Sequence, residues 1–198
     1  MGERWPVRAS DGHTFELLVE APKQPRAVLF FAPAMGVDAS YYGPFVEGLS
    51  QQGILVAMCD LRGHGTSSLR PRRGVDFGYR EIIELDIPAA LSVVREQTAG
   101  VPLYVGGHSL GGQLVMLHVA ATKPDIAGMA LVACAIPYFR NWHGRSRAWI
   151  RLAAAVIFPL AGFVLGYVPG AHVRWARDAD DVVRAVAGWI GERPASQV

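Results

Sequence analysis

Short apolar runs alternate along most of the chain with segments in which apolar residues recur every three or four positions. The runs predict buried strands at residues 27–32, 54–59, 101–105 and 127–134, and a partly alternating segment predicts an earlier strand at 14–19. The segments between them predict helices at residues 42–52, 81–98 and 110–123. Pro88 lies inside the second of these helices and predicts a kink or a late helix start. Because strands alternate with helices, the pattern predicts an α/β fold with a mostly parallel central sheet and helices on both faces.

The pattern changes after residue 136. Residues 148–168 are almost entirely apolar, with four interruptions: Arg151, Pro159, Gly162 and Gly166. These four interruptions argue against a transmembrane helix in this segment, since such a helix needs about 20 apolar residues. The interruptions favour instead a small apolar cap of one or two helices, with a break at Pro159. A last amphipathic helix is predicted at residues 178–190, with an apolar stripe of Val182, Val183, Val186 and Ile190.

Length and charge narrow the class of protein. The 198 residues suit a single domain, 1–198, whose core needs neither disulfides nor metal. With 51% hydrophobic and 18% charged residues the chain does not have a disordered composition. The net charge is only +2, and the arginines are dispersed apart from two small groups, at residues 70–73 and 140–147. Nucleic acid is therefore not an expected partner.

The two cysteines and the first residues of the sequence indicate the cellular compartment that we expect for the protein. Cys59 and Cys134 each end an apolar run, where buried structural thiols are expected rather than a secreted disulfide scaffold. No apolar segment of the signal-peptide type follows Met1, so a cytoplasmic location is the expectation. No group of His, Cys or carboxylate residues has metal-ligand spacing, and no Walker or dinucleotide motif is present, so neither a metal nor a cofactor is expected.

The strongest chemical motif is the turn Gly-His-Ser-Leu-Gly at residues 107–111, between a predicted strand and a predicted helix. A serine in so tight a turn has strained backbone geometry, and its neighbours must be very small, as Gly107, Gly111 and Gly112 are. The turn places the Ser109 hydroxyl at a helix N-terminus, where developing negative charge is stabilised. Ser109 is therefore the predicted nucleophile, and the alternative is a glycine-rich connection with an incidental serine.

Two backbone amides are candidates for an oxyanion hole, the pair of donors that a tetrahedral intermediate requires. Leu110 N–H, directly after the serine, is the first. The second is expected from the loop at residues 33–36, which follows the strand at 27–32, and counting from the strand end selects Met35 N–H. The alternative is that residues 33–36 are only a turn.

Several motifs in order resemble the α/β-hydrolase superfamily. They are FAPAMG at residues 31–36, the tyrosine pair at 41–42, DLRGHGTS at 60–67 and GHSLGGQL at 107–114. The chain resembles the serine-hydrolase branch with lysophospholipase-like and serine-aminopeptidase-like esterases, and a bacterial group of predicted hydrolases. The resemblance covers roughly residues 10–170 and implies the α/β-hydrolase fold. It also implies that the turn at 60–67 is structural, so that His64 is a scaffold residue rather than a base.

The resemblance implies the order nucleophile, acid, base. His172, just before the last predicted helix, resembles the family's histidine position and is the candidate base; the alternative is an ordinary loop histidine. No acid is located. Asp125 precedes its strand and so lies at the opposite edge of the sheet, and Asp60 belongs to a strand roughly 10 Å or more away. Three aspartates after the histidine are not favoured either: Asp178, Asp180 and Asp181.

The short stretch between Ser109 and His172 implies a shortened hydrolase with reduced C-terminal strands and a cap-like insertion at 137–170. The favoured function is cleavage of a small carboxylic ester with a hydrophobic acyl or alkyl part, through an acyl-enzyme on Ser109. Arginines ahead of the apolar segment add the hypothesis of peripheral contact with an anionic lipid surface through 140–168. The alternative is a catalytically impaired or non-catalytic binding protein of the same fold, and the oligomeric state is open.

Overall fold

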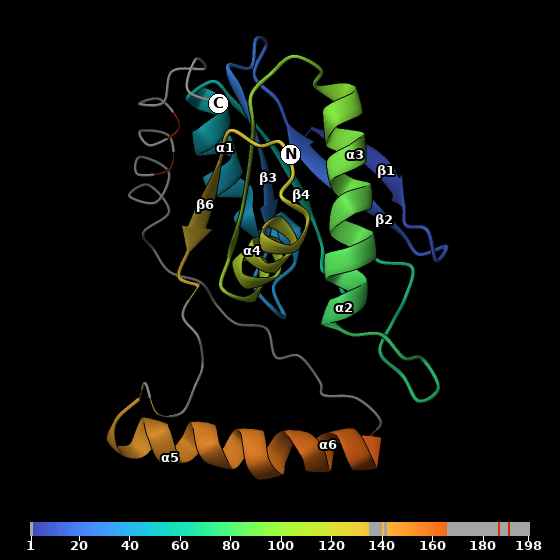
Figure 1. Cartoon of the computed structure of the whole chain (residues 1–198), viewed down its shortest axis with the longest axis vertical. Coiled ribbons are helices and arrows are strands. Elements are labelled where there is room, and N and C mark those ends of the chain that lie inside the picture. Colours follow the sequence, from blue (N-terminus) through green and yellow to red (C-terminus); the bar gives the residue numbers. More distant parts are fainter. Residues whose placement is uncertain (1, 135–139, 141, 166–185, 187–189, 191–198) are drawn as a thin grey trace.

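One sheet forms the centre of the computed structural model, which describes residues 2–134, 140, 142–165, 186 and 190. Within these residues the strand order is β1-β2-β4-β3-β5-β6 (Figure 1). The strands are β1 (Glu3–Arg8), β2 (Thr14–Glu20), β3 (Ala27–Ala32), β4 (Ile54–Cys59), β5 (Leu103–His108) and β6 (Gly128–Val132). β4, β3, β5 and β6 run parallel, whereas β1 pairs with β2, and β2 with β4, in antiparallel fashion. The predicted α/β fold with a mostly parallel sheet is confirmed.

The wholly apolar runs form the middle of the sheet. Every residue of β3, β4 and β5 is buried, as expected of strands covered on both faces. β1 was not predicted from the sequence, because it is an edge strand with mostly exposed positions and a proline in its middle. An edge strand tolerates Pro6, since the missing N–H interrupts pairing on one side only.

Helices cover both faces of this sheet. They are α1 (Gly43–Gln51), preceded by the 3₁₀ turn η1 (Ala39–Tyr42), then α2 (Tyr79–Glu81), the π-helical turn η2 (Ile82–Asp86), α3 (Ile87–Gln97) and α4 (Leu110–Thr122). Pro88 lies in the first turn of α3, directly after the π-helical turn η2, within a helical run that already begins at Tyr79. The sequence predicted a kink or a late helix start at Pro88, and the late start was wrong, because the π-helical turn before the proline accommodates it within the helix.

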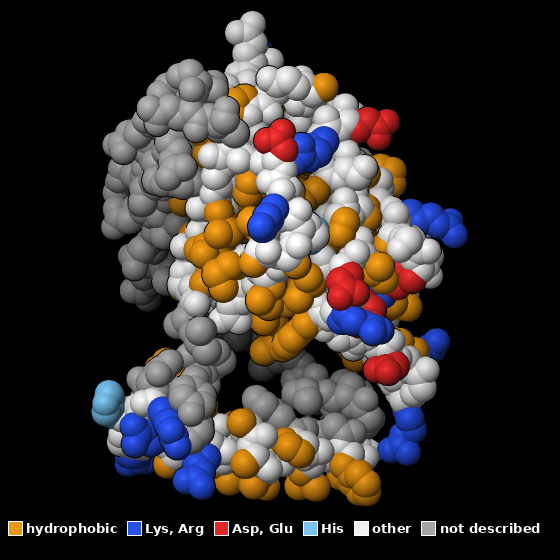
Figure 2. Space-filling view, in the orientation of Figure 1, with side chains coloured by type: hydrophobic (Ala, Val, Ile, Leu, Met, Phe, Trp, Pro, Cys, Tyr) orange, Lys and Arg blue, Asp and Glu red, His pale blue; other side chains and the backbone are white. Residues whose placement is uncertain are grey.

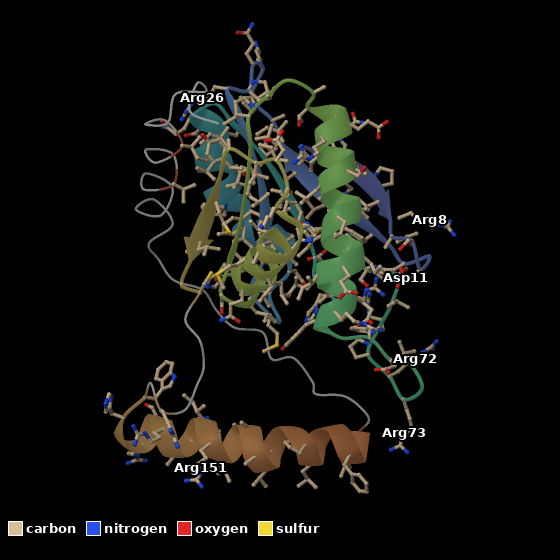
Figure 3. All side chains as sticks on the ribbon, in the orientation of Figure 1. Arg8, Asp11, Arg26, Arg72, Arg73 and Arg151 are labelled. Atoms are coloured by element: carbon tan, nitrogen blue, oxygen red, sulfur yellow. The ribbon has the colours of Figure 1, made fainter. Side chains whose placement is uncertain are left out.

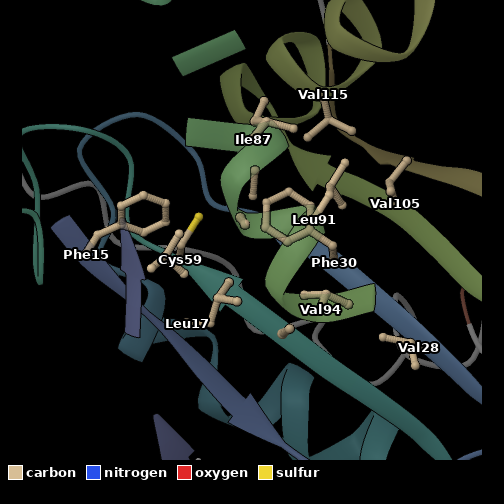
Figure 4. Packing of buried hydrophobic residues seen from close by; sticks show 14 of the residues in the cluster. Phe15, Leu17, Val28, Phe30, Cys59, Ile87, Leu91, Val94, Val105 and Val115 are labelled. Atoms are coloured by element: carbon tan, nitrogen blue, oxygen red, sulfur yellow. The ribbon is translucent and has the colours of Figure 1, made fainter. Parts of the chain in front are cut away.

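Alternate residues of β3 define two halves of the core. Val28 and Phe30 point toward the face covered by α3 and α4, where Leu91 and Val94 pack against them (Figure 4). Leu29 and Phe31 belong to the opposite half, together with the apolar face of α1. Two described helical residues of the predicted last stripe, Val186 and Ile190, are buried in that second half.

A long helix lies beyond the carboxyl ends of the parallel strands (Figure 1). It consists of α5 (Gly144–Leu152), the π-helical turn η4 (Ala153–Ile157) and α6 (Phe158–Leu165). The expected break at Pro159 was wrong: the π-helical turn ends just before the proline, which occupies the first turn of α6 and is accommodated without a break. None of the described helices has the length and apolar character needed to cross a membrane. A cap role for 137–170 stays a prediction.

Candidate active site at the turn after β5

Ser109 stands between the last residue of β5 and the first residue of α4. Its backbone has φ 50° and ψ −118°, a conformation that non-glycine residues rarely adopt. Two hydrogen bonds hold the turn: Ser109 N–H donates to Val132 O at 2.9 Å, and Ser109 O accepts from Gln113 N–H at 3.1 Å. The fold therefore maintains the strained geometry that the motif predicted.

The glycines around Ser109 are required by close backbone approach. A Cβ on Gly107 would lie 2.5 Å from Gly112 N. A Cβ on Gly111 would overlap Pro33 O, and one on Gly112 would overlap the sulfur of Cys134. The predicted need for very small neighbours is confirmed, and the contact between Gly111 and Pro33 packs the start of α4 against the loop after β3.

That loop carries the second predicted oxyanion donor. Val37 N–H donates to Ala34 O at 3.2 Å, and Gly36 has a φ of 74°, so residues 34–37 form a tight turn with Met35 at its second position. The strand register pairs Ala32 with Gly107 and so brings the ends of β3 and β5 together. Met35 and Leu110 consequently lie on adjoining segments, as an oxyanion hole requires, and the Met35 side chain is 56% exposed.

Tyr42 and His108 connect this loop to the serine turn. Tyr42 Oη accepts a hydrogen bond from Ala34 N–H at 2.9 Å and lies 2.9 Å from His108 Nδ1. Burial lowers the pKa of His108 to about 4, so the ring is neutral near pH 7. Burial also raises the pKa of Tyr42 to about 12, which keeps its proton on the hydroxyl, available for donation to His108. Sequence reasoning noted the tyrosine pair only as a motif and missed this contact.

Asp60 and His64 both hold the turn at residues 60–67. The Asp60 carboxylate accepts Ala39 N–H at 2.7 Å and Thr66 N–H at 2.8 Å. Gly65 packs so closely on this carboxylate that any side chain there would overlap it. His64 Nδ1 lies 3.3 Å from Arg62 O within the same turn. These contacts agree with the structural role that the resemblance implied for both residues.

A second buried group has the residue types of a catalytic triad but not its accessibility. His13 Nδ1 lies 3.0 Å from Asp86 Oδ1, and His13 Nε2 lies 2.9 Å from Ser67 Oγ. Ser67 is buried and also accepts the N–H groups of Gly63 and Leu69. A substrate carbonyl cannot reach a hydroxyl enclosed in this way. The group therefore joins the β1–β2 hairpin to the turn at 60–67, a structural role that sequence reasoning missed.

Arginine holds the acid of this buried group. Arg62 donates to both oxygens of Asp86, at 2.9 and 2.6 Å, and to Asp11 at 2.6 Å. The hydrogen bond from Arg62 lowers the pKa of Asp11 below its ordinary value. Both oxygens of Asp86 are thus held in an ion pair with Arg62.

The remaining predicted site residues are placed as follows. Asp125 lies between α4 and β6, at the edge of the sheet opposite Ser109, as predicted. His172 lies outside the described residues, and so do three predicted carboxylates: Asp178, Asp180 and Asp181. Among the described residues, no group of three or more His, Cys, Asp or Glu side chains could hold a metal ion.

A mostly parallel sheet with a strained serine turn after a central strand, beside a loop that can supply a second amide, defines an α/β-hydrolase. More narrowly, the chain belongs to the serine aminopeptidase S33 family (Hydrolase_4), whose sequence model matches residues 23–186.

Individual relatives agree with this class. Monoglyceride lipase of Rattus norvegicus is 26% identical over 144 residues, which are 73% of this chain and 46% of the relative. A monoglyceride lipase homolog of Monkeypox virus is 29% identical over 104 residues, 52% of this chain and 36% of the relative. The chain thus spans less than half the length of these relatives. Est1E from Butyrivibrio proteoclasticus, solved with ferulic acid, superimposes with a TM-score of 0.63 at 17% identity over 95% of this chain and 98% of that one, a likeness of fold.

Proposed function

We propose that the protein is a serine hydrolase of small carboxylic esters with a hydrophobic acyl or alkyl part. The observation that carries this proposal is the strained backbone of Ser109, with φ 50° and ψ −118°, at the carboxyl end of β5. Strain of this kind persists only where surrounding contacts enforce it, and it concentrates at functional sites. Here the contacts are the hydrogen bond to Val132 O and the glycines packed around the turn.

The proposed reaction begins with attack of Ser109 Oγ on the ester carbonyl carbon. The carbonyl oxygen becomes an oxyanion that accepts the N–H groups of Leu110 and Met35. His172 takes the serine proton and delivers it to the departing alcohol, leaving an acyl group on Ser109. Water then attacks the acyl carbon and gives up a proton to the same histidine, which releases the carboxylic acid and restores the serine. No residue is assigned as the acid that orients His172.

The proposed substrate class, an ester with an apolar part, is supported by the surface near Ser109 and by the relatives of the chain. The Met35 side chain is more than half exposed beside the serine turn, so apolar surface is available to a substrate chain. The name of the reported relatives, monoglyceride lipase, supports an ester over an amide. We also propose peripheral contact of 140–168 with a lipid surface, since an ester with a long apolar part resides there.

A non-catalytic binding protein of the same fold is the second candidate. It is favoured by the state of two buried carboxylates, Asp60 and Asp86, because both are held by other groups. The distinction between the two candidates depends on whether Ser109 reacts.

Labelling with a fluorophosphonate tests this directly, because the probe modifies only a serine activated as a nucleophile. We expect labelling of the full chain at pH 7.5, with the modified peptide containing Ser109, and no labelling of Ser109→Ala. Ser92→Ala, an exposed position on α3, is the matched control and should label fully. Modification of Ser67 instead, or none under conditions that label a standard esterase, would overturn the proposal.

A further inference from the structure

A stripe of large apolar side chains runs along the helix formed by α5, η4 and α6. It consists of Trp149, Leu152, Val156, Leu160 and Phe163, which recur at intervals of three or four residues and so share one side of the helix. These side chains are 46–85% exposed, and Phe163 reaches 85%. Figure 2 shows apolar side chains along the edge of this helix that faces away from the sheet.

Positive charge accompanies the stripe at both ends. Arg145, Arg147 and Arg151 lie on α5 and are exposed. At the other end, Arg73 approaches from the loop before α2 and donates to Val164 O at 3.0 Å (Figure 3). The sequence has no Asp or Glu between residues 126 and 177. This stretch of the chain therefore supplies apolar and cationic side chains and no carboxylate of its own.

This combination has one complementary occupant, the surface of an anionic bilayer. An apolar stripe next to guanidinium groups is the pattern of helices that lie in the interface between headgroups and acyl chains. Arginine can bury its methylene groups beside such a stripe and still reach phosphate oxygens. A second copy of the chain fits less well, because two such faces would bring like-charged guanidinium groups together.

We propose that the helix α5–α6 docks on an anionic phospholipid bilayer, with the stripe among the upper acyl carbons and the arginines on phosphates. The helix lies on the same side of the sheet as the carboxyl ends of the strands, where Ser109 also lies (Figure 1). Docking therefore orients the serine turn toward the membrane. The binding itself does not depend on catalysis; only its use for collecting a lipid ester rests on the proposed function.

Flotation with lipid vesicles tests the docking, with the full chain carrying Ser109→Ala so that no lipid is cleaved. We expect binding to vesicles of phosphatidylcholine with 30% phosphatidylglycerol as the chosen composition, and little binding to phosphatidylcholine alone. Replacing three arginines together, Arg145→Gln, Arg147→Gln and Arg151→Gln, should weaken partitioning on the order of a hundredfold. Added salt should weaken it further.

A separate variant tests the contribution of the apolar stripe to vesicle binding. Leu160→Ser with Phe163→Ser should weaken partitioning about tenfold or more, since burial of these side chains contributes to binding. Leu117→Ser on α4 and Arg8→Gln on β1 are matched controls, one exposed leucine and one exposed arginine away from the helix, and should partition as the parent does. Circular dichroism melting checks that each variant is folded.

Depth of insertion gives a second measurement. Brominated acyl chains should quench the fluorescence of Trp149 on binding, and Trp149→Phe should remove most of that quenching. Equal binding to neutral and anionic vesicles, no binding, or equal loss in the control variants would overturn the proposal. So would a dimer in gel filtration that Leu160→Ser with Phe163→Ser converts to a monomer.

The two proposals fail separately. If the wild-type chain hydrolyses a short water-soluble ester but the Ser109→Ala chain does not bind vesicles, docking alone is wrong. If vesicles are bound but neither the ester nor the fluorophosphonate reacts, the hydrolase proposal alone is wrong.

Discussion

The hydroxyl of Tyr42 lies 2.9 Å from Nδ1 of His108, the residue directly before Ser109, and it accepts the N–H of Ala34, the residue directly before Met35. One buried phenol therefore connects the loop that carries one proposed oxyanion donor to the turn that carries the nucleophile. Since an oxyanion hole acts only when its donors are held in place before the reaction, Tyr42 is a positioning residue for the proposed chemistry.

Tyr42→Phe should lower kcat for a soluble ester by about tenfold and leave KM nearly unchanged, because the donors shift while the substrate surface remains. A donor that loses its partner when buried costs about 1–3 kcal/mol, so the free energy of unfolding should fall by that amount. Tyr41→Phe is the matched control, since that neighbouring ring is 46% exposed. Steady-state kinetics and urea unfolding measure both effects. Equal behaviour of the two variants would show that the contact does not position the loop.

His108 makes stability depend on pH. Burial lowers its pKa from 6.5 to about 4 in the folded protein, whereas in the unfolded chain it takes up a proton near pH 6.5. Between these values the unfolded chain binds more protons, so the free energy of unfolding should decrease as the pH falls from about 6.5 to about 4. The decrease from this residue should approach roughly 3 kcal/mol.

Urea unfolding at pH 7 and pH 4.5 measures this decrease. His108→Gln should reduce the difference between the two pH values, whatever its effect at pH 7. His118 is also buried, and burial lowers its pKa, so some decrease should remain in that variant. His64→Gln, a partly exposed histidine, is the control. An unchanged difference in His108→Gln would contradict the assignment.

Much of the fold was predictable because the relevant signals are local. The central strands β3 and β4 have the bounds predicted from their apolar runs, since burial on both faces leaves no polar position within them. The serine turn was predictable for the same reason, as its strain and its glycines lie within six residues. β1 was not, because at an edge only Val7 of its six residues is buried.

The contacts between distant segments were not predictable. Tyr42 and His108 are 66 positions apart, and His13 and Asp86 are 73 apart. In the sequence, nothing near any of these four residues distinguishes it from an ordinary polar residue. Only the completed fold brings the two pairs together. The prediction of a helix break at Pro159 was wrong for a different reason. The spacing of apolar residues does not reveal a π-helical turn, and the extra residue in that turn accommodates the proline ring.

Asp86→Ala should destabilise the protein strongly. It removes the carboxylate that Arg62 and His13 both contact, and an ion pair broken on one side leaves a buried charge, at a cost of about 3–5 kcal/mol. The matched control is Glu81→Ala, which removes the ion pair with Arg80 and the hydrogen bond from Gly78 N–H, and it should destabilise the protein much less. Denaturant unfolding measures both. If Asp86→Ala is as stable as Glu81→Ala, the buried group does not hold the hairpin to the turn.

His172→Ala tests the proposed base. General-base catalysis contributes about 10²–10⁴-fold, so kcat should fall within that range while urea unfolding stays close to that of the parent. His143→Ala, an exposed histidine just before α5, should leave kcat unchanged. The pH dependence adds a readout that a structural role would not produce: the parent should lose activity in acid, where an imidazole base becomes protonated, and His172→Ala should not. Full turnover in His172→Ala, with Ser109→Ala inactive, would mean that another group takes the serine proton.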